Sequence, residues 1–162
     1  MQPLTPEDVQ RALADLLPGT KITFFEDSTA TSEQAAAAIG CELGQIVKSL
    51  AFIVDDTPIL VLASGDQRIE TRKLAAMFDV GRKKVKVAKP EQCIEIYGYA
   101  PGGVPPLGHR NAIRIYIDDS LQRYEQVYAA AGAYNAIFPV LFDNLVRITN
   151  GQIADVKVDE TE

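Results

Sequence analysis

Apolar residues recur along this chain with two different periods, and each period predicts a different kind of element. Stretches in which they recur every three to four residues predict helices, and several of these stretches begin with a residue that can cap a helix, as at Thr5, Thr31 and Thr71. Pro18-Gly19 and Gly40 provide stop signals for the first two. The predicted helices span residues 6–17, 32–40, 72–78, 90–97 and 143–149.

Alternating positions and short apolar runs predict strands. The predicted strands span residues 22–24, 46–54, 59–63, 85–87, 113–117, 126–131, 136–140 and 153–158. Asp55-Asp56-Thr57-Pro58 joins the two most apolar strands and predicts a hairpin. Helices and strands are interspersed, and several connections are typical of hairpins. We therefore expect an α+β fold, a single domain over residues 1–162 with a mixed, mostly antiparallel and barrel-like sheet flanked by helices.

The composition is that of an ordinary globular protein. The 162 residues are 47% hydrophobic and 23% charged, no repeat or linker divides them, and no apolar run reaches the ~18–20 residues needed to span a bilayer. The first residues lack the basic start and the apolar stretch of a signal peptide. Cys41 and Cys93 are too few for a disulfide framework, so we expect a reducing, cytoplasmic location.

The net charge of −6 argues against a protein that coats nucleic acid by bulk electrostatics, yet the charge is unevenly distributed. Residues 68–89 hold half of the Lys and Arg residues and carry a charge of +6, which leaves −12 on the rest of the chain. This segment has two interpretations: a solvated helix face with a charged edge strand, or a docking patch for a phosphate backbone. Charge alone favours the first interpretation, because most charge runs are solvated.

Conventional catalytic residues are scarce. The chain has one histidine, His109, at the end of a loop, and no nucleophile motif accompanies it. Two distant cysteines and one histidine do not supply the several ligands of a metal site, so we expect no metal and no cofactor. The cysteines are more typical of small buried apolar residues than of nucleophiles. The chain also lacks the glycine patterns of phosphate-binding and dinucleotide-binding loops.

Lys48 is unusual because it lies inside the apolar run 46–54. A buried ammonium group must reach water, pair with an anion or lose its proton. By the two-residue period of a strand, Lys48 shares a face with Ile46, Leu50 and Phe52, and that face is apolar. The two interpretations are a lysine that points outward from a half-exposed strand and a pocket lysine that awaits an anionic ligand.

The loop 98–108 is the second unusual segment, because four glycines and three prolines occur within its eleven residues. Glycines let a ligand approach the backbone closely, and exposed N–H groups in such a loop can hold a carbonyl oxygen, a hydroxyl or a phosphate. The alternative is a tight structural crossover between a helix and a strand. Composition alone favours that alternative.

Taken in order, these segments resemble the YbaK family, the free-standing relatives of the editing domain inserted in bacterial prolyl-tRNA synthetases. The resemblance covers most of the chain, and its specific parts are Lys48 in its apolar strand and the Gly-Pro loop. The matching segments are Thr31–Ala36 with Gly40, Gln45–Leu50, Gly65–Glu70 with Lys73–Ala75, Gly98-Tyr99, Gly102–Gly108, Asp143 and Ile153–Val156.

The resemblance implies a trans-acting aminoacyl-tRNA deacylase, which hydrolyses the ester between a wrong amino acid and the 3′-terminal adenosine of a tRNA. By position, Lys48 matches the pocket lysine that contacts the phosphate of the terminal nucleotide. Gly103, Pro106 and Gly108 match a G-x-x-P-x-G loop that positions the ester and the ribose, and Asp143 matches an acidic position near the pocket. The further substrate-binding candidates are Thr31, Gly102, Val104 and His109.

The implied chemistry is consistent with the residues. An aminoacyl ester is an activated acyl group, so backbone N–H groups can stabilise the oxyanion while a water positioned by the Gly-Pro loop attacks. The expected partner is the acceptor end of a mischarged tRNA, with an aminoacyl-tRNA synthetase as a further candidate and neither a membrane nor DNA. The cations that we assign to tRNA docking are Arg82, Lys83, Lys84 and Lys86.

Two departures from the family pattern bear on the substrate. Members that act on cysteinyl-tRNA often carry a basic Gly-Lys-Arg-Gly-like segment where this chain has Gly132-Ala133-Tyr134-Asn135, and Asn144 replaces the leucine that usually follows the aspartate. Alanyl-, seryl- and threonyl-tRNA are therefore candidates beside cysteinyl-tRNA, with tRNA-Pro as a candidate carrier. The alternative function is a non-catalytic protein that binds an aminoacyl-nucleotide or a nucleotide in the same pocket.

Overall fold

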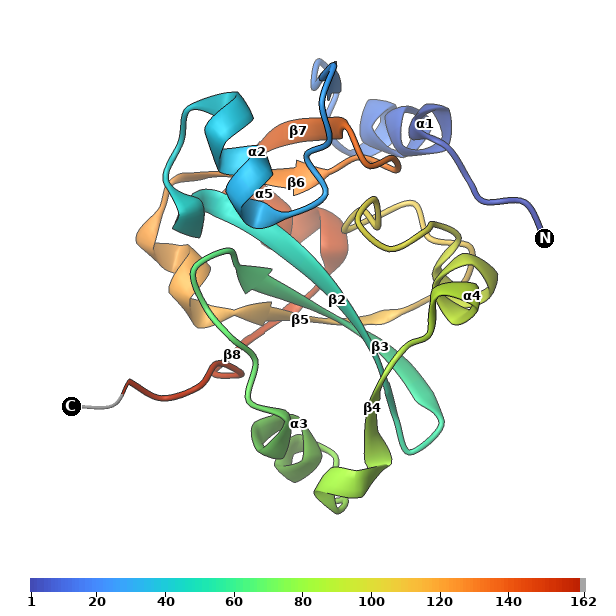
Figure 1. The fold of residues 1–162 in the computed structure, drawn as a ribbon, viewed down its shortest axis with the longest axis vertical. Coiled ribbons are helices and arrows are strands. Elements are labelled where there is room, and N and C mark those ends of the chain that lie inside the picture. Colours follow the sequence, from blue (N-terminus) through green and yellow to red (C-terminus); the bar gives the residue numbers. More distant parts are fainter. Residues whose placement is uncertain (161–162) are drawn as a thin grey trace.

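Eight strands form one mixed sheet in the structure, a computed structural model that describes residues 1–160 (Figure 1). The strand order is β1-β7-β6-β2-β3-β5-β8, and β4 pairs with β2 outside this path. The pairs β2/β6, β3/β5 and β5/β8 are parallel, and the other four are antiparallel. The strands are β1 Thr23–Phe24, β2 Ile46–Val54, β3 Thr57–Ser64, β4 Val85–Val87, β5 Arg114–Asp118, β6 Gln126–Ala130, β7 Ala136–Leu141 and β8 Gln152–Ala154.

Short helices flank this sheet. The α-helices are α1 Pro6–Leu16, α2 Ser32–Ile39, α3 Thr71–Met77, α4 Pro90–Gln92 and α5 Phe142–Thr149, and the 3-10 or π segments are η1 Leu43–Gln45, η2 Arg82–Lys84, η3 Cys93–Tyr97 and η4 Asp119–Arg123. Figure 1 shows α1, α2 and α5 near β6 and β7 at one end of the molecule, and α3 beside β4 at the other. Within residues 1–160, every helix is too short or too polar to cross a membrane.

Strand β2 is the centre of the fold because it pairs with three other strands. β3 follows it through a tight hairpin, in which Asp55 and Asp56 adopt the positive φ angles, 47° and 68°, that a two-residue turn requires. The other edge of β2 is shared, because β6 pairs with Ile46 and Val47 and β4 pairs with residues 52–54. The sheet is therefore split on this side of β2, between β6 and β4.

Apolar clusters lie on both faces of the β2–β3 hairpin, since alternate residues of a strand face opposite sides. Helix α1 completes the larger cluster through Val9 and Leu13, which are fully buried. Helix α3 completes a second cluster through Leu74, which packs with Phe52 of β2. By alternation Lys48 is on the same face as Phe52, as the sequence predicts.

The expected α+β class, with a mixed and mostly antiparallel sheet flanked by helices, is confirmed. The sheet does not close into a barrel within the described residues, because its path ends at β1 and β8 and these two strands do not pair with each other. The hairpin turn is shorter than predicted, with β3 beginning at Thr57. The helix predicted over 90–97 is confirmed, although its second half is the π segment η3.

Two boundaries differ from the sequence prediction for identifiable reasons. Thr71 is the first residue of α3 and not its cap, because the Glu70 carboxylate accepts a hydrogen bond from the Arg72 N–H at 3.1 Å. Strand β8 ends at Ala154, four residues earlier than predicted. Beyond that point the chain is held mainly by side chains, since Asp155 and Lys157 form ion pairs with residues of α3 and η4.

Candidate active site

A cavity of about 490 Å³ opens where the sheet is split between β6 and β4. One wall is formed by residues 46–52 of β2. The others come from α2 with the segment before it, from the end of β4, from β6 and β7, and from the Gly-Pro loop. This volume lies within the range of small-molecule sites, roughly 300–1,000 Å³. The cavity therefore brings together segments that are more than 100 residues apart in sequence.

Lys48 lines this cavity from β2 and is half-buried. Its ammonium group donates a short hydrogen bond to the main-chain carbonyl oxygen of Gln67. Burial lowers the pKa of the Lys48 ammonium below its ordinary value, while the carboxylates of Glu33, Asp118 and Asp66 oppose that change. The geometry favours the pocket interpretation of Lys48, a cation with one protein partner on the wall of a cavity.

The amino-terminal end of α2 forms the adjacent wall, where Thr31, Ser32 and Glu33 line the cavity. Thr31 caps the helix as predicted, since its hydroxyl accepts a hydrogen bond from the Gln34 N–H at 3.1 Å. Ser32 is 7% exposed, and its hydroxyl has no hydrogen-bond partner in the described residues. The first N–H groups of this helix and its partial positive charge therefore lie on the same cavity as Lys48.

The Gly-Pro loop contributes Pro101, Gly102 and Val104 to the cavity. Gly102 has a φ of +90°, and a Cβ atom there would lie 3.0 Å from the Cβ of Ala30. Gly103 is packed still more closely, because a Cβ atom there would lie 2.9 Å from the main-chain nitrogen of Ala133. These two glycines let the loop approach two other segments of the protein, and that close approach holds Val104 at the cavity wall.

Other residues singled out from the sequence lie outside the cavity lining within residues 1–160. Gly103 and Pro106 are buried in the loop, and Gly108 lies behind it, where its carbonyl oxygen accepts a hydrogen bond from the Tyr99 hydroxyl at 2.8 Å. Asp143 is exposed in the first turn of α5, because the apolar residues of that helix occupy its buried face. His109 lies next to Gly108.

His109 is held by the loop itself. Its Nε2–H donates to the carbonyl oxygen of Pro105 at 2.7 Å, and its ring meets that of Tyr97 edge to face. Burial lowers the pKa of the imidazole, although the hydrogen bond to Pro105 opposes this. A neutral His109 thus stabilises the shape of the Gly-Pro loop in the free protein.

The lining residues provide positioning groups and little nucleophilic power. Cys93 reaches the cavity, but burial raises the pKa of its thiol, so it stays protonated near neutral pH. The hydroxyls of Ser32 and Ser49 have no hydrogen-bonded base within residues 1–160. No three His, Cys, Asp or Glu residues gather there in a metal-binding arrangement. This arrangement can bind and orient a reactive ester, and it leaves the attack to water.

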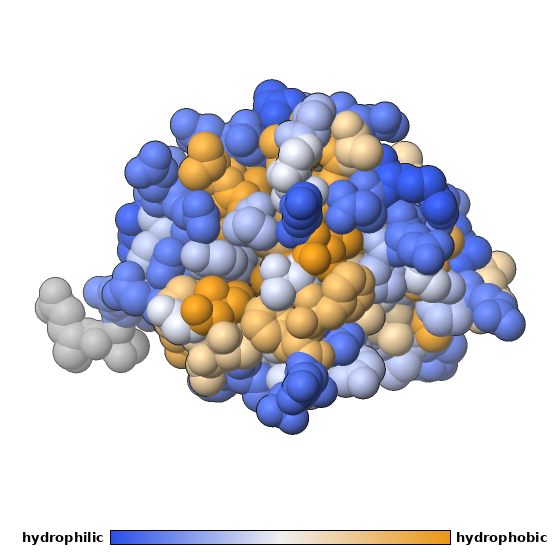
Figure 2. All heavy atoms as spheres, turned by 90° about the horizontal axis from the view of Figure 1, so that it is seen from above, coloured by the Kyte–Doolittle hydropathy of each residue, from blue (hydrophilic) through white to orange (hydrophobic). Residues whose placement is uncertain are grey.

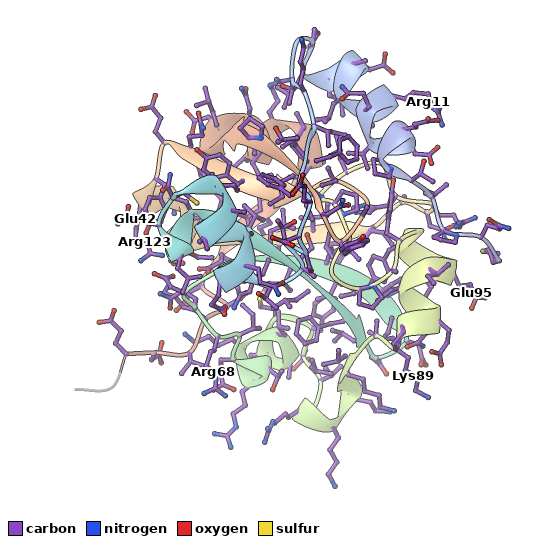
Figure 3. All side chains as sticks on the ribbon, turned by 45° about the horizontal axis from the view of Figure 1, so that its top comes forward. Arg11, Glu42, Arg68, Lys89, Glu95 and Arg123 are labelled. Carbon is purple, nitrogen blue, oxygen red and sulfur yellow. The ribbon has the colours of Figure 1, made fainter. Side chains whose placement is uncertain are left out.

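The docking residues predicted from charge lie on one exposed surface. Arg82, Lys83 and Lys84 form η2, and Lys86 follows in β4. Figure 3 shows the two ends of the basic segment, with Arg68 beside α3 and Lys89 at the start of α4. Val87, the next residue of β4, is 73% exposed and lines the cavity. The basic surface thus reaches the cavity through β4.

Sequence reasoning did not single out Ser32, Ser49, Val87 or Cys93 as cavity residues. A signal existed only for Ser49, which is the second polar residue in an otherwise apolar strand and follows Lys48 directly. The others are placed by the split in the sheet, which depends on pairings between distant segments. Figure 2 shows apolar side chains gathered near the middle of one face of the molecule, among hydrophilic ones.

Comparison with known proteins assigns this arrangement to a family. A model described as "Aminoacyl-tRNA editing domain" matches residues 26–148. A protein of Bacillus subtilis named "Uncharacterized protein YwhH" is 39% identical over 116 residues, which are 71% of this chain and 72% of the relative. A protein of Enterococcus faecalis named "Putative Cys-tRNA(Pro)/Cys-tRNA(Cys) deacylase EbsC" is 28% identical over 131 residues, with 80% of this chain and 79% of the relative covered.

A solved structure shows the same fold. It is described as "Crystal structure of a putative trans-editing enzyme for prolyl tRNA synthetase" and superposes with a TM-score of 0.88 at 37% identity. The match covers 95% of this chain and 97% of the other. The similarity therefore includes the whole sheet, the cavity and the Gly-Pro loop.

Proposed function

The chain belongs to the aminoacyl-tRNA editing domain family, and on that premise we propose that it hydrolyses the ester bond of mischarged aminoacyl-tRNA. The observation that carries the proposal is Lys48, a half-buried cation on the wall of the cavity, beside the amino-terminal end of α2. An anionic group that reaches this corner meets an ammonium group and a helix N-terminus together. The phosphate of the terminal adenosine has the charge that suits this corner.

The reaction needs positioning more than it needs a nucleophile. Lys48 holds the terminal nucleotide, Thr31 borders the same corner, and Gly102 and Val104 border the aminoacyl ester. Gly103, Pro106 and Gly108 keep the loop in shape, and His109 stabilises it. A water held between this loop and the ester attacks the carbonyl carbon. The ester bond to the ribose then breaks, and the ribose oxygen takes up a proton.

The amino acid that is removed is small in our proposal. Alanyl-, seryl-, threonyl- and cysteinyl-tRNA are the candidates, with tRNA-Pro as carrier, since two similar proteins have names that refer to editing of tRNA-Pro or to prolyl-tRNA synthetase. The turn at 132–135 lacks the basic residues common in family members that act on cysteinyl-tRNA. A hydroxyl or a methyl group changes affinity by only ~1–3 kcal/mol in such pockets, so a panel of substrates is required.

The remaining tRNA binds along the exposed basic surface in this proposal. Arg82, Lys83, Lys84 and Lys86 approach phosphates of the acceptor stem, while the 3′ end passes Val87 into the cavity. The acidic remainder of the chain limits binding elsewhere. A synthetase that charges the same tRNA is a further candidate partner, and the cytoplasm is the compartment in which such tRNA is charged.

The test is a deacylation panel with the purified protein. Transfer RNAs mischarged with Ala, Ser, Thr and Cys are incubated beside correctly charged controls, and loss of the labelled amino acid is measured. We expect hydrolysis of at least one mischarged tRNA and a loss of about 100-fold or more in Lys48→Ala. Lys21→Ala, which removes an exposed lysine outside the cavity, is the matched control. Binding without hydrolysis of any substrate would support the non-catalytic alternative.

A further inference from the structure

The main chain of β2 has one position that faces the cavity without a strand partner. Alternate residues of a strand present their N–H and C=O groups to the same edge. The carbonyl oxygen of Ile46 accepts a hydrogen bond from the Gly65 N–H, so even-numbered residues face β3. The carbonyl oxygen of Ala51 accepts one from Ala88, at the end of β4, so odd-numbered residues face the split edge.

Ser49 lies in the middle of this split. β6 pairs with β2 as far as Val47, and the contact with the end of β4 begins at Ala51. In the registers of residues 1–160, Ser49 is left between the two, with its N–H and C=O pointing toward the missing strand. The gap from Val47 to Ala51 measures roughly 13 Å along the strand at ~3.3 Å per residue. The exposure of Ser49 itself agrees, since the residue is partly exposed while its Oγ atom is inaccessible to solvent.

A free strand edge binds groups that mimic another strand. An aminoacyl group carries an ammonium donor and a carbonyl acceptor on either side of its α-carbon, as a residue of a strand does. We propose that the Ser49 main chain binds the aminoacyl group itself, with its N–H donating to the ester carbonyl oxygen and its C=O accepting from the α-ammonium group. This inference rests on the proposed function, because it places the substrate of that function in the split of the sheet.

Two consequences follow from this placement. The contacts involve only atoms that all aminoacyl esters share, so the Ser49 main chain recognises the class of substrate and leaves the choice of amino acid to the surrounding side chains. The Ser49 N–H also stabilises the negative charge that develops on the carbonyl oxygen when water attacks. Lys48 and Ser49 then have separate tasks, because the Lys48 side chain holds the nucleotide and the Ser49 main chain holds the ester.

Amide hydrogen exchange tests the inference at single-residue resolution. The probe is 3′-alanylamino-3′-deoxyadenosine 5′-phosphate, in which a stable amide replaces the ester. In the free protein the Ser49 N–H should exchange at least about tenfold faster than the Leu50 N–H, which faces β3 and is the internal control. Saturation with the probe should slow exchange at Ser49 by about tenfold or more and leave Leu50 unchanged. An analogue that lacks the α-amine should bind about tenfold more weakly.

The outcomes separate the two proposals. If the probe binds and shifts the resonances of Lys48 while exchange at Ser49 is unchanged, the inference is overturned and the proposed function stands. If the probe does not bind at all, both are overturned. Replacing the Ser49 N–H alone by an ester oxygen, through incorporation of the α-hydroxy analogue of serine, should lower kcat/KM by about tenfold or more. An unchanged kcat/KM in that protein would also overturn the inference.

Discussion

Lys48 and Gln67 are connected directly at the edge of the cavity, where the Lys48 ammonium donates a hydrogen bond to the Gln67 carbonyl oxygen. The turn that carries Gln67 is itself held from outside the cavity. Arg123 donates to both carboxylate oxygens of Asp66, at 2.8 and 3.1 Å, and to the Ser64 hydroxyl at 2.9 Å. The position of the Lys48 side chain therefore depends on η4, which does not line the cavity in the described residues.

Replacing Arg123 with Met should lower deacylation by loosening this turn. The ion pair with Asp66 is partly exposed and contributes less than about 1 kcal/mol to stability, so folding should change little. The position of Lys48 should change more, and we expect kcat/KM to fall by about tenfold. Steady-state kinetics and thermal unfolding of the same preparation check this. Activity equal to wild type would contradict the connection between η4 and Lys48.

Replacing Lys48 with Met should abolish activity while making the protein slightly more stable. Because burial lowers the pKa of Lys48, the folded state binds this proton less tightly than the unfolded state does, and stability increases as pH rises through the lowered pKa. Removing the ammonium group should stabilise the fold by no more than about 1 kcal/mol, since the side chain is only half-buried. The gain should appear near neutral pH and vanish at strongly alkaline pH. Thermal unfolding at both pH values measures it, and a loss of stability at neutral pH would be contrary to this expectation.

Replacing Gly103 with Ala should destabilise the protein without touching the cavity lining. The added Cβ atom would lie 2.9 to 3.0 Å from main-chain atoms of Ala133, and the main chain there cannot easily move because the Gly132 N–H donates to the Gly103 carbonyl oxygen at 2.9 Å. We expect a loss of about 1–3 kcal/mol in the free energy of unfolding, measured with urea. Gly81→Ala is the control, because its Cβ atom would meet nothing within 4 Å. Equal effects of the two changes would contradict the packing argument.

Stability should fall in mild acid partly because of His109. Burial lowers the pKa of this imidazole in the folded state below its ordinary value of 6.5. The unfolded state therefore binds more protons below about pH 6.5, and stability decreases as pH falls through that range. Between pH 7.5 and 5.5, wild type should lose about 1 kcal/mol more than His109→Gln, in which the side-chain amide can still donate to Pro105. Urea unfolding at the two pH values provides the comparison, and parallel losses would show that His109 does not titrate on unfolding.

Charge reversal at Lys83, Lys84 and Lys86 should weaken tRNA binding and spare small substrates. These side chains are exposed and lie outside the cavity lining, so hydrolysis of a minimal aminoacyl-nucleotide should stay within about twofold of wild type. The slope of log Kd against log salt for tRNA should decrease by about one unit for each phosphate that no longer binds a lysine. Binding titrations at several salt concentrations measure the slope. An unchanged affinity would return this surface to the solvated interpretation.

The predictable parts of the fold are those that short segments encode. Capping residues and apolar spacing place the helices that follow Thr5 and Thr31, and the Asp55-Asp56 turn places the central hairpin, because these signals act over a few residues. The end of β8 was not predictable, since it depends on ion pairs formed by Asp155 and Lys157 with distant residues.

The same division applies to the cavity. The sequence by itself determined that Lys48 lies in an apolar strand and that a Gly-Pro loop follows, since both are features of local pattern. Only the tertiary structure decided that β6 and β4 share one edge of β2 and leave Ser49 between them. Strand pairing over such separations depends on which distant segments satisfy each other's N–H and C=O groups, and side-chain periodicity does not record that choice.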